Sequence, residues 1–304
     1  MADFINSEKD VIEKFPVGTN FILNGKTYTV SNIGKPSPSN GRGEPKTDVY
    51  IKANSANDEI ELKISIKQTN ADFLENKMTK DRIIQVFGKD WNIVVFNCID
   101  SIRSNFYNKK LIFKAKSGRV REGSMTLGWR FEIANKNQGE LSGLLPLDKT
   151  PQYYREVLSG DNLEEGKRNS KVNGVVIQNS GVAEYILEVD KNERFPTAQE
   201  IIDNIELIND YIIDKKLYFT CKASNVLIKP AGTRKVEGNR ALSVYLKWIA
   251  DNGRLNYSLN FDKPFDVKGQ DVIGCLNVCL SQLNIITTDN INNNNISNPN
   301  IIHS

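Results

Sequence analysis

The sequence predicts a mixed α/β fold with a β-rich C-terminal half. Short runs of alternating apolar residues are separated by turn signals such as Asn24-Gly25 and Asp251-Asn252-Gly253, which are typical of hairpins. Other segments repeat their apolar residues every three or four positions, which indicates amphipathic helices. The 304 residues suffice for one large domain or two ordinary ones. We expect a core in residues 1–160, its continuation or a second β-rich region in residues 161–286, and a low-complexity tail in residues 287–304.

Composition excludes several classes of function. The net charge of +3 does not by itself indicate a nucleic-acid partner, so local clusters of charge matter more. Neither a signal peptide nor a run of eighteen apolar residues is visible, so we expect a cytoplasmic protein. The chain has four cysteines and one histidine, His303. These numbers argue against a Cys/His zinc site and against histidine-based catalysis, and we expect buried, reduced thiols.

The N-terminal half alternates between predicted helices and strands. A cap at residues 7–10 precedes a short apolar helical stripe, and a Gly/Pro/Ser-rich loop fills residues 34–46. The remaining expected elements are a hairpin over 20–33, strands over 47–53 and 60–68, a helix over 71–88, and a buried strand over 91–99.

The C-terminal half is expected to contain more strands than helices. Strands are predicted over 110–135, 216–229 and 240–261, and helices over 150–160, 197–214 and 269–283.

The strand expected over residues 60–68 carries an unusual row of polar side chains. Alternation places Leu62, Ile64 and Ile66 on one face, and four polar residues on the other: Glu61, Lys63, Ser65 and Lys67. Asp48 begins the preceding strand, and pairing of the two strands brings it near Lys67 or Lys63. Carboxylates that hold Mg²⁺ beside a lysine suit phosphodiester hydrolysis, whereas an ordinary solvated strand face is the alternative.

At these residues the chain resembles the PD-(D/E)XK nuclease superfamily, which includes type II restriction endonucleases. "PKTDVYI" is similar to the first part of the family pattern through Asp48, and "ISIKQ" to the second part through Lys67, but Ser65 stands where the family has an acid. The resemblance covers about residues 5–97. It implies a restriction-endonuclease-like central mixed sheet flanked by helices, a Mg²⁺ site and cleavage of double-stranded DNA. A symmetric DNA site would suit a homodimer.

Two replacements for the missing acid remain open. The resemblance allows the acid to come from the following helix, where Asp72 and Glu75 are available, and Lys67 with Glu75 is the preferred set. Alternatively, Glu61 and Lys63 form the acid–lysine pair, and Lys67 contacts phosphate. Two further candidates for the metal or its water are Glu44 and Glu13.

Three basic segments are candidate DNA contacts. The first has no acid between Phe106 and Arg121, the second lies on a glycine-rich loop, and the third flanks the expected site. Their expected DNA-binding residues are Lys110, Lys114, Lys116, Arg119 and Arg121, then Arg234, Lys235 and Arg240, and finally Arg42. The competing functions are a non-catalytic DNA-binding or structural module with the nuclease fold, and a nuclease acting on RNA or on DNA ends.

Overall fold

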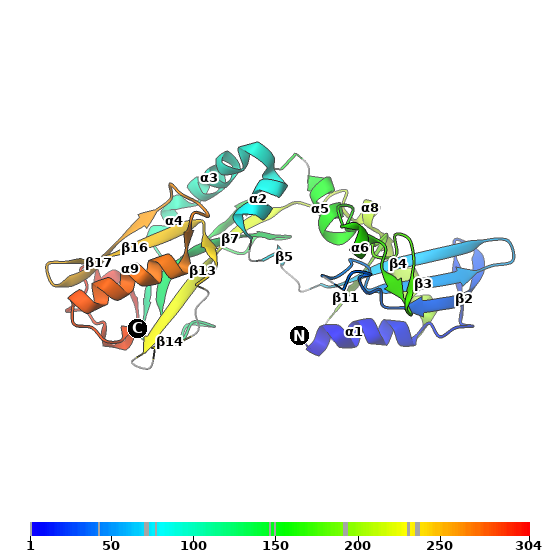
Figure 1. The fold of residues 1–304 in the computed structure, drawn as a ribbon, viewed down its shortest axis with the longest axis horizontal. Coiled ribbons are helices and arrows are strands. Elements are labelled where there is room, and N and C mark those ends of the chain that lie inside the picture. The colour runs from blue at the N-terminus through cyan, green and yellow to red at the C-terminus, as the bar shows by residue number, and fades with distance from the viewer. Residues whose placement is uncertain are drawn as a thin grey trace. The chain divides into compact units, whose positions relative to one another are not determined.

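The chain forms two compact units, each assembled from two separate segments. The computed structural model describes residues 2–41, 43–69, 73–76, 78–145, 147–148, 150–190, 194–229, 232–234 and 238–304, with the side chains of 2–6 and 232–234 not described. Unit 1 comprises Met1–Asp72 and Leu147–Lys215, and unit 2 comprises Phe73–Pro146 and Lys216–Ser304 (Figure 1). The expected boundaries at residues 160 and 286 are therefore wrong, because later segments of the chain complete sheets that earlier segments begin.

Unit 1 contains a mixed six-stranded sheet in the order β1-β2-β3-β4-β11-β12. Strands β1 to β4 form an antiparallel meander, and β11 then runs parallel to β4. The expected Asn24-Gly25 hairpin is confirmed, with both residues at positive φ. The strands are β1 (Asn20–Leu23), β2 (Lys26–Gly34), β3 (Val49–Asn54), β4 (Glu59–Gln68), β11 (Tyr185–Val189) and β12 (Glu206–Leu207), with a separate hairpin of β9 (Lys171–Val172) and β10 (Val175–Val176).

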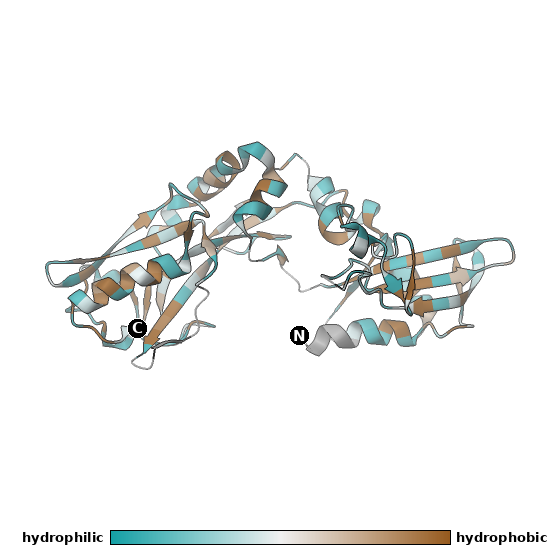
Figure 2. Cartoon of the chain, viewed as in Figure 1, coloured by the Kyte–Doolittle hydropathy of each residue, from teal (hydrophilic) through white to brown (hydrophobic). Residues whose placement is uncertain are grey.

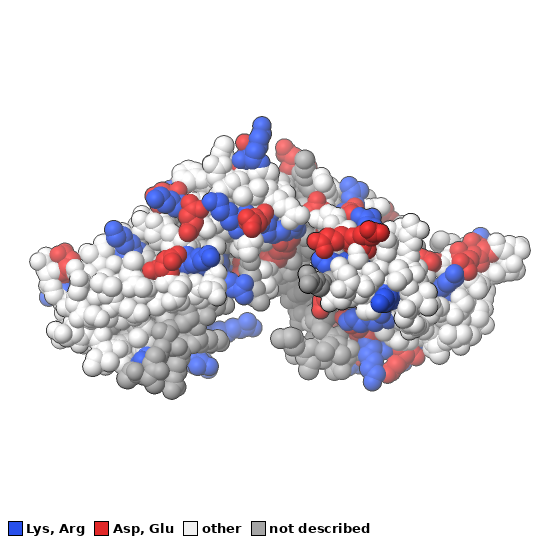
Figure 3. All heavy atoms as spheres, viewed as in Figure 1, with Lys and Arg blue, Asp and Glu red and all other residues white. Residues whose placement is uncertain are grey.

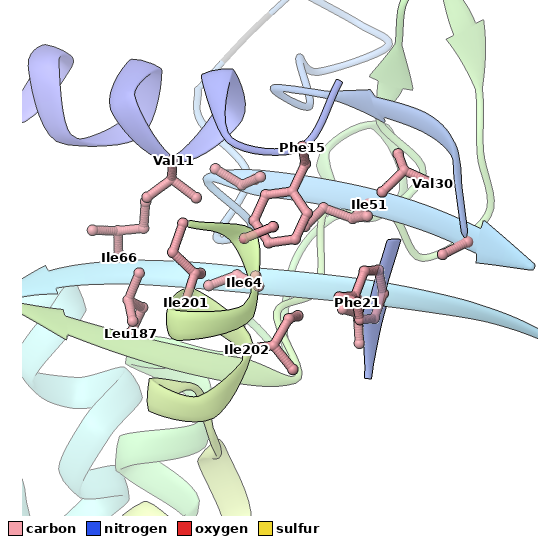
Figure 4. Packing of buried hydrophobic residues seen from close by; sticks show 14 of the residues in the cluster. Val11, Phe15, Phe21, Val30, Ile51, Ile64, Ile66, Leu187, Ile201 and Ile202 are labelled. Atoms are coloured by element: carbon pink, nitrogen blue, oxygen red, sulfur yellow. The ribbon is translucent and has the colours of Figure 1, made fainter. Parts of the chain in front are cut away.

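Helices cover both faces of this sheet. On one face, Val11 of α1 (Ala2–Glu13), Phe15 just after this helix and Ile201 of α7 (Ala198–Asn204) pack on apolar side chains of β3, β4 and β11 (Figure 4). In Figure 1 the opposite side carries α5 (Thr150–Leu158), α6 (Glu165–Arg168) and α8 (Ile208–Tyr211). Lys63 and Ser65, on the second face of β4, are only 7% and 0% exposed. The middle of the polar face of β4 is therefore buried and is not a solvated surface.

Unit 2 is built around a nine-stranded sheet whose main path is β14-β13-β7-β16-β17. Figure 2 shows alternating apolar and polar residues along its long strands. Its strands are β5 (Phe73–Glu75), β6 (Ile112–Phe113), β7 (Met125–Ala134), β8 (Ser142–Leu144), β13 (Tyr218–Lys229), β14 (Gly232–Arg234), β16 (Val244–Asp251), β17 (Arg254–Asn260) and β19 (Ile302–His303), with β15 (Ala241–Leu242) paired separately to β18 (Val267–Lys268). The helices are α2 (Lys80–Phe87), α3 (Trp91–Ser101), α4 (Arg103–Tyr107) and α9 (Gly269–Gln282), and 3-10 turns occupy Gly88–Asp90, Thr288–Asn290 and Pro299–Ile301.

Three expected elements are wrong in type or extent. The helix expected over 71–88 is strand β5, paired with β7, followed by α2, which begins only after the Thr79 cap. The strand expected over 91–99 is helix α3, which buries Val95, Cys98 and Ile99 at helical spacing. A short apolar run fits either structure, and this spacing decides for the helix. The helix expected over 197–214 is interrupted by β12, which pairs with β11.

The predicted low-complexity tail is also wrong, because residues 287–304 are packed into unit 2. Ile291, Ile296 and Ile301 are buried, and β19 pairs in parallel with β6. Asparagine side chains close the intervening turns; Asn298, for example, accepts the N–H of Asn300 at 3.0 Å. Among the described residues, no helix is both long and apolar enough to cross a membrane.

Candidate active site in unit 1

Asp48 is fixed by the backbone of the neighbouring strand. It directly precedes β3, and its N–H donates to the carbonyl oxygen of Ile64 at 2.8 Å. Its carboxylate accepts the N–H of Ile66 at 2.7 Å and the hydroxyl of Ser65 at 3.4 Å. Because Val49 lies opposite Ile64, the strand register itself sets Asp48 beside Ser65. The pairing that the sequence predicts thus brings Asp48 to the Ser65-x-Lys67 segment.

Lys67 acts electrostatically on Asp48. Burial raises the pKa of Asp48 above its ordinary value, while the Lys67 charge and the Ile66 N–H each lower this pKa without cancelling the effect of burial. Asp48 therefore carries its charge at a cost in solvation and has a nearby cation that partly compensates. A carboxylate of this kind is suited to gaining a further cation.

A second acid reaches this place from α1, and sequence reasoning missed it. The Glu8 carboxylate further raises the pKa of Asp48, and Lys35, which follows β2, lowers it. Glu8 and Lys35 form an ion pair in which the Glu8 side chain is only 14% exposed. The site thus gathers two carboxylates and two lysines at the ends of β2 and β4 and the start of β3.

The signal for Glu8 was present in the sequence as a helical stripe. Residues 7–10 look like a cap, but α1 begins at Ala2, so Glu8 lies within the helix. Glu8 precedes Val11 by three positions, which places both on the same stripe of α1, and Phe15, just beyond the end of the helix, continues the spacing of this stripe. Since Val11 and Phe15 pack on the sheet, this stripe also directs Glu8 towards the sheet.

The Glu61–Lys63 alternative belongs to a different network. Glu61 accepts the hydroxyl of Tyr50 at 2.7 Å, and Lys63 pairs with Glu184 at 2.5 Å. Glu61 lies opposite Lys52 in the register, four residues or about 13 Å along the strand from Ser65. The structure therefore favours Lys67 as the lysine that accompanies Asp48.

The expected metal-binding role of Glu75 depends on a helix directly after β4, and this expected helix is wrong. Glu75 lies on β5 in unit 2, not on a helix that follows β4, and Arg82 binds both of its carboxylate oxygens. Asp72 lies outside the described residues. Glu44 is exposed, and the exposed Glu13 pairs with Lys9 of the same helix. Glu8 is the second acid that the described residues bring towards Asp48.

The predicted DNA-contacting cations have different surroundings. Lys110 donates to the carbonyl of Asn300 at 2.6 Å and Lys114 to that of Asp289, so both amines hold the C-terminal segment. Burial lowers the pKa of Lys114. Three others are exposed around the Ser117–Val120 turn: Lys116, Arg119 and Arg121. Arg240 is half-buried, and Arg42, Lys235 and the Arg234 side chain lie outside the description. On the face in Figure 3, basic and acidic residues are interspersed.

Comparison with protein-family models, with curated proteins and with solved structures gives no match for this chain. Within the described ranges, no group of three or more His, Cys, Asp or Glu side chains is arranged to hold a metal ion. Mg²⁺, however, commonly uses one or two carboxylates and completes its shell with water and substrate phosphate. Asp48 and Glu8 fit that smaller requirement in number, and burial leaves the Asp48 carboxylate in need of positive charge, whereas Glu8 is paired with Lys35.

Proposed function

We propose that unit 1 is a Mg²⁺-dependent endonuclease of restriction type that hydrolyses phosphodiester bonds in double-stranded DNA. The observation that carries this proposal is the meeting of Asp48, Lys67 and Glu8, where a raised Asp48 pKa marks a carboxylate that is short of positive charge. The mixed sheet with helices on both faces, the acid before β3 and the lysine in β4 also support the resemblance to the PD-(D/E)XK superfamily. In this proposal the acid absent at Ser65 comes from α1.

The roles of the side chains follow from their partners. Asp48 and Glu8 would hold Mg²⁺, which when bound stabilises the negative charge that develops on the phosphate. The Ile66 N–H and the Ser65 hydroxyl orient the Asp48 carboxylate and occupy Oδ2, leaving Oδ1 as the oxygen with remaining acceptor capacity. The Lys67 ammonium donates hydrogen bonds that orient the attacking water or a phosphate oxygen, and Lys35 balances the charge of Glu8.

The test is cleavage of supercoiled plasmid with and without Mg²⁺. Asp48→Ala should abolish nicking and leave DNA binding largely intact, because most phosphate contacts lie elsewhere. Glu59→Gln is the matched control, since Glu59 begins β4 at its other end and pairs there with Lys52 at 2.8 Å. Equal cleavage by Asp48→Ala and wild-type protein would overturn the site.

A non-catalytic DNA-binding or structural module is the second candidate. The observation in its favour is that Ser65 replaces an acid and that Lys35 already neutralises Glu8. This candidate predicts that wild-type protein binds duplex DNA but leaves it intact in Mg²⁺ and in Mn²⁺. Cleavage that depends on Asp48 would exclude it.

A further inference from the structure

Unit 2 contains a pocket that the proposed active site does not use. Its volume is about 480 Å³, within the usual range for small-molecule sites. Its walls include Lys109, Lys110, Phe113, Gln138, Lys222 and His303. They come from the segment around β6, from the residues after β7, from β13 and from the C-terminal strand β19. Four stretches of chain far apart in sequence therefore converge on one cavity.

The pocket has an excess of positive charge. Lys109 is paired with Glu140, which also lines the cavity, and this pairing lowers the pKa of Glu140. Lys110 donates to the neutral carbonyl group of Asn300. The Lys222 ammonium lies 4.9 Å from the centroid of the Phe73 ring. Neither of these two lysines has a recorded carboxylate partner among the described residues. The lining thus favours an anionic ligand.

Gln138 supplies a hydrogen-bond donor that the protein itself does not use. Its Nε2 atom is buried, and the described residues offer it no acceptor. A buried donor without an acceptor is costly, and native proteins generally satisfy such groups with water or a ligand. An oxygen atom of a ligand in this pocket would accept from the amide.

Two aromatic rings line the pocket, with their planes tilted by 53° to each other. Phe113 of β6 and His303 of β19 lie with their ring centroids 5.7 Å apart, because the two strands pair in parallel with Phe113 opposite His303. Both rings are partly exposed and line the pocket. A heteroaromatic base can stack on rings of this kind while its phosphate reaches the lysines.

We propose that this pocket binds a nucleoside phosphate. The phosphate lies between Lys110 and Lys222, the Gln138 amide donates to one of the ligand's oxygens, and the base stacks on one of the two tilted rings, Phe113 or His303, with its edge against the other. The nucleotide is either part of a DNA strand or free in solution. The DNA source rests on the proposed function, whereas binding of a free nucleotide does not.

The test measures binding by the full chain carrying Asp48→Asn, in EDTA, so that cleavage plays no part. One arm titrates a fluorescein-labelled DNA duplex and the other titrates dATP, with deoxyadenosine as the phosphate-free control. Gln138→Glu should weaken binding by about tenfold or more, because it replaces the amide donor with a carboxylate that repels the oxygen of the ligand. Lys222→Ala should weaken it by several-fold, and Lys247→Ala, at an exposed position on β16, should not.

The two arms identify the source of the nucleotide. If Gln138→Glu and Lys222→Ala weaken binding of the DNA duplex only, the pocket holds part of the substrate strand. If they weaken binding of dATP only, the pocket holds a free nucleotide. Undiminished binding of both probes by Gln138→Glu and Lys222→Ala, in proteins that melt as wild type does, would overturn the proposal. So would binding of deoxyadenosine as tight as that of dATP. If Gln138→Glu does not fold, Lys222→Ala alone decides. Cleavage by wild-type protein in Mg²⁺ tests the proposed function separately.

Discussion

The carboxylate of Asp48 accepts the backbone N–H of Ile66 at 2.7 Å across the β3–β4 pair. This contact fixes a charged group in a place where burial disfavours its charge and raises its pKa. The site therefore holds an acid whose ionisation lowers the stability of the folded chain. Removing the charge of Asp48 should therefore raise the stability of the folded chain and weaken its binding of a metal ion.

Asp48→Asn should raise the stability of the protein at pH 7 to 8. The folded-state pKa of Asp48 lies above its unfolded value, so the folded protein binds more protons and the stability that this group contributes is lost as the pH rises through the folded pKa. Asparagine keeps the acceptor for Ile66 and carries no charge. Its advantage should shrink as the pH falls towards 4, measured by urea unfolding over that range. A constant difference at all pH values would refute the electrostatic explanation.

Glu8→Gln should remove about 100-fold or more of the Mg²⁺-dependent cleavage. It should also remove the rise in melting temperature that Mg²⁺ gives the wild-type protein, because a ligand that binds only the folded state stabilises it. Glu13→Gln is the control on the same helix, since Glu13 is exposed and pairs with Lys9. Full activity of Glu8→Gln would mean that the second acid comes from elsewhere.

Glu75→Gln should destabilise the protein and leave cleavage within about threefold of wild type. The side chains of Glu75 and Arg82 are 20% and 22% exposed, and loss of their charged hydrogen bonds should cost about 1–3 kcal/mol in the free energy of unfolding. Thermal melting and plasmid nicking on the same preparation separate the two effects. Loss of cleavage with an unchanged melting temperature would instead place Glu75 in the active site.

Deleting residues 288–304 should unfold unit 2. Each of Ile291, Ile296 and Ile301 contributes roughly 1.5–3 kcal/mol by its burial, and the sum approaches the whole stability of an ordinary domain. The point variant Ile291→Ala should cost about 2–5 kcal/mol, and Asn293→Ala, at an exposed position, less than about 0.5 kcal/mol. Melting of the deletion variant within a degree or two of wild type would show that the segment is not part of the fold.

Local chemistry explains which parts of the fold could be predicted. The hairpin at Asn24-Gly25 and the β3–β4 pair depend on turn residues and alternation within a few positions, and both are visible in the sequence. The pairing of β4 with β11 joins Ile64 to Tyr185, across more than a hundred residues, and no local pattern specifies it. The helical α3 and the packed C-terminal segment were obscured for a related reason, since tertiary burial decides how short apolar runs fold.

The candidate site, too, could be predicted from the sequence only where its residues meet through local strand pairing. Asp48 directly precedes β3 and Lys67 lies on the adjacent β4, so their meeting follows from strand pairing alone. Glu8 lies within α1, which begins at Ala2, whereas the cap pattern at residues 7–10 predicts a later start and leaves Glu8 outside the apolar stripe. Glu75 follows from the sequence only if residues 71–88 form one helix, and the pairing of β5 with β7 replaces the first part of that helix.

The chain passes between the two units three times, after Asp72, Pro146 and Lys215. During synthesis, therefore, β3 and β4 emerge long before β11 and β12, which complete their sheet, and these in turn emerge before β13, which pairs with β7 in the sheet of unit 2. Neither unit can close until most of the polypeptide has left the ribosome, and the many non-local pairings favour slow folding. A premature stop anywhere before β13 would leave unit 2 without the long strand that pairs with β7, β8 and β14, so such a truncated chain could not complete the sheet.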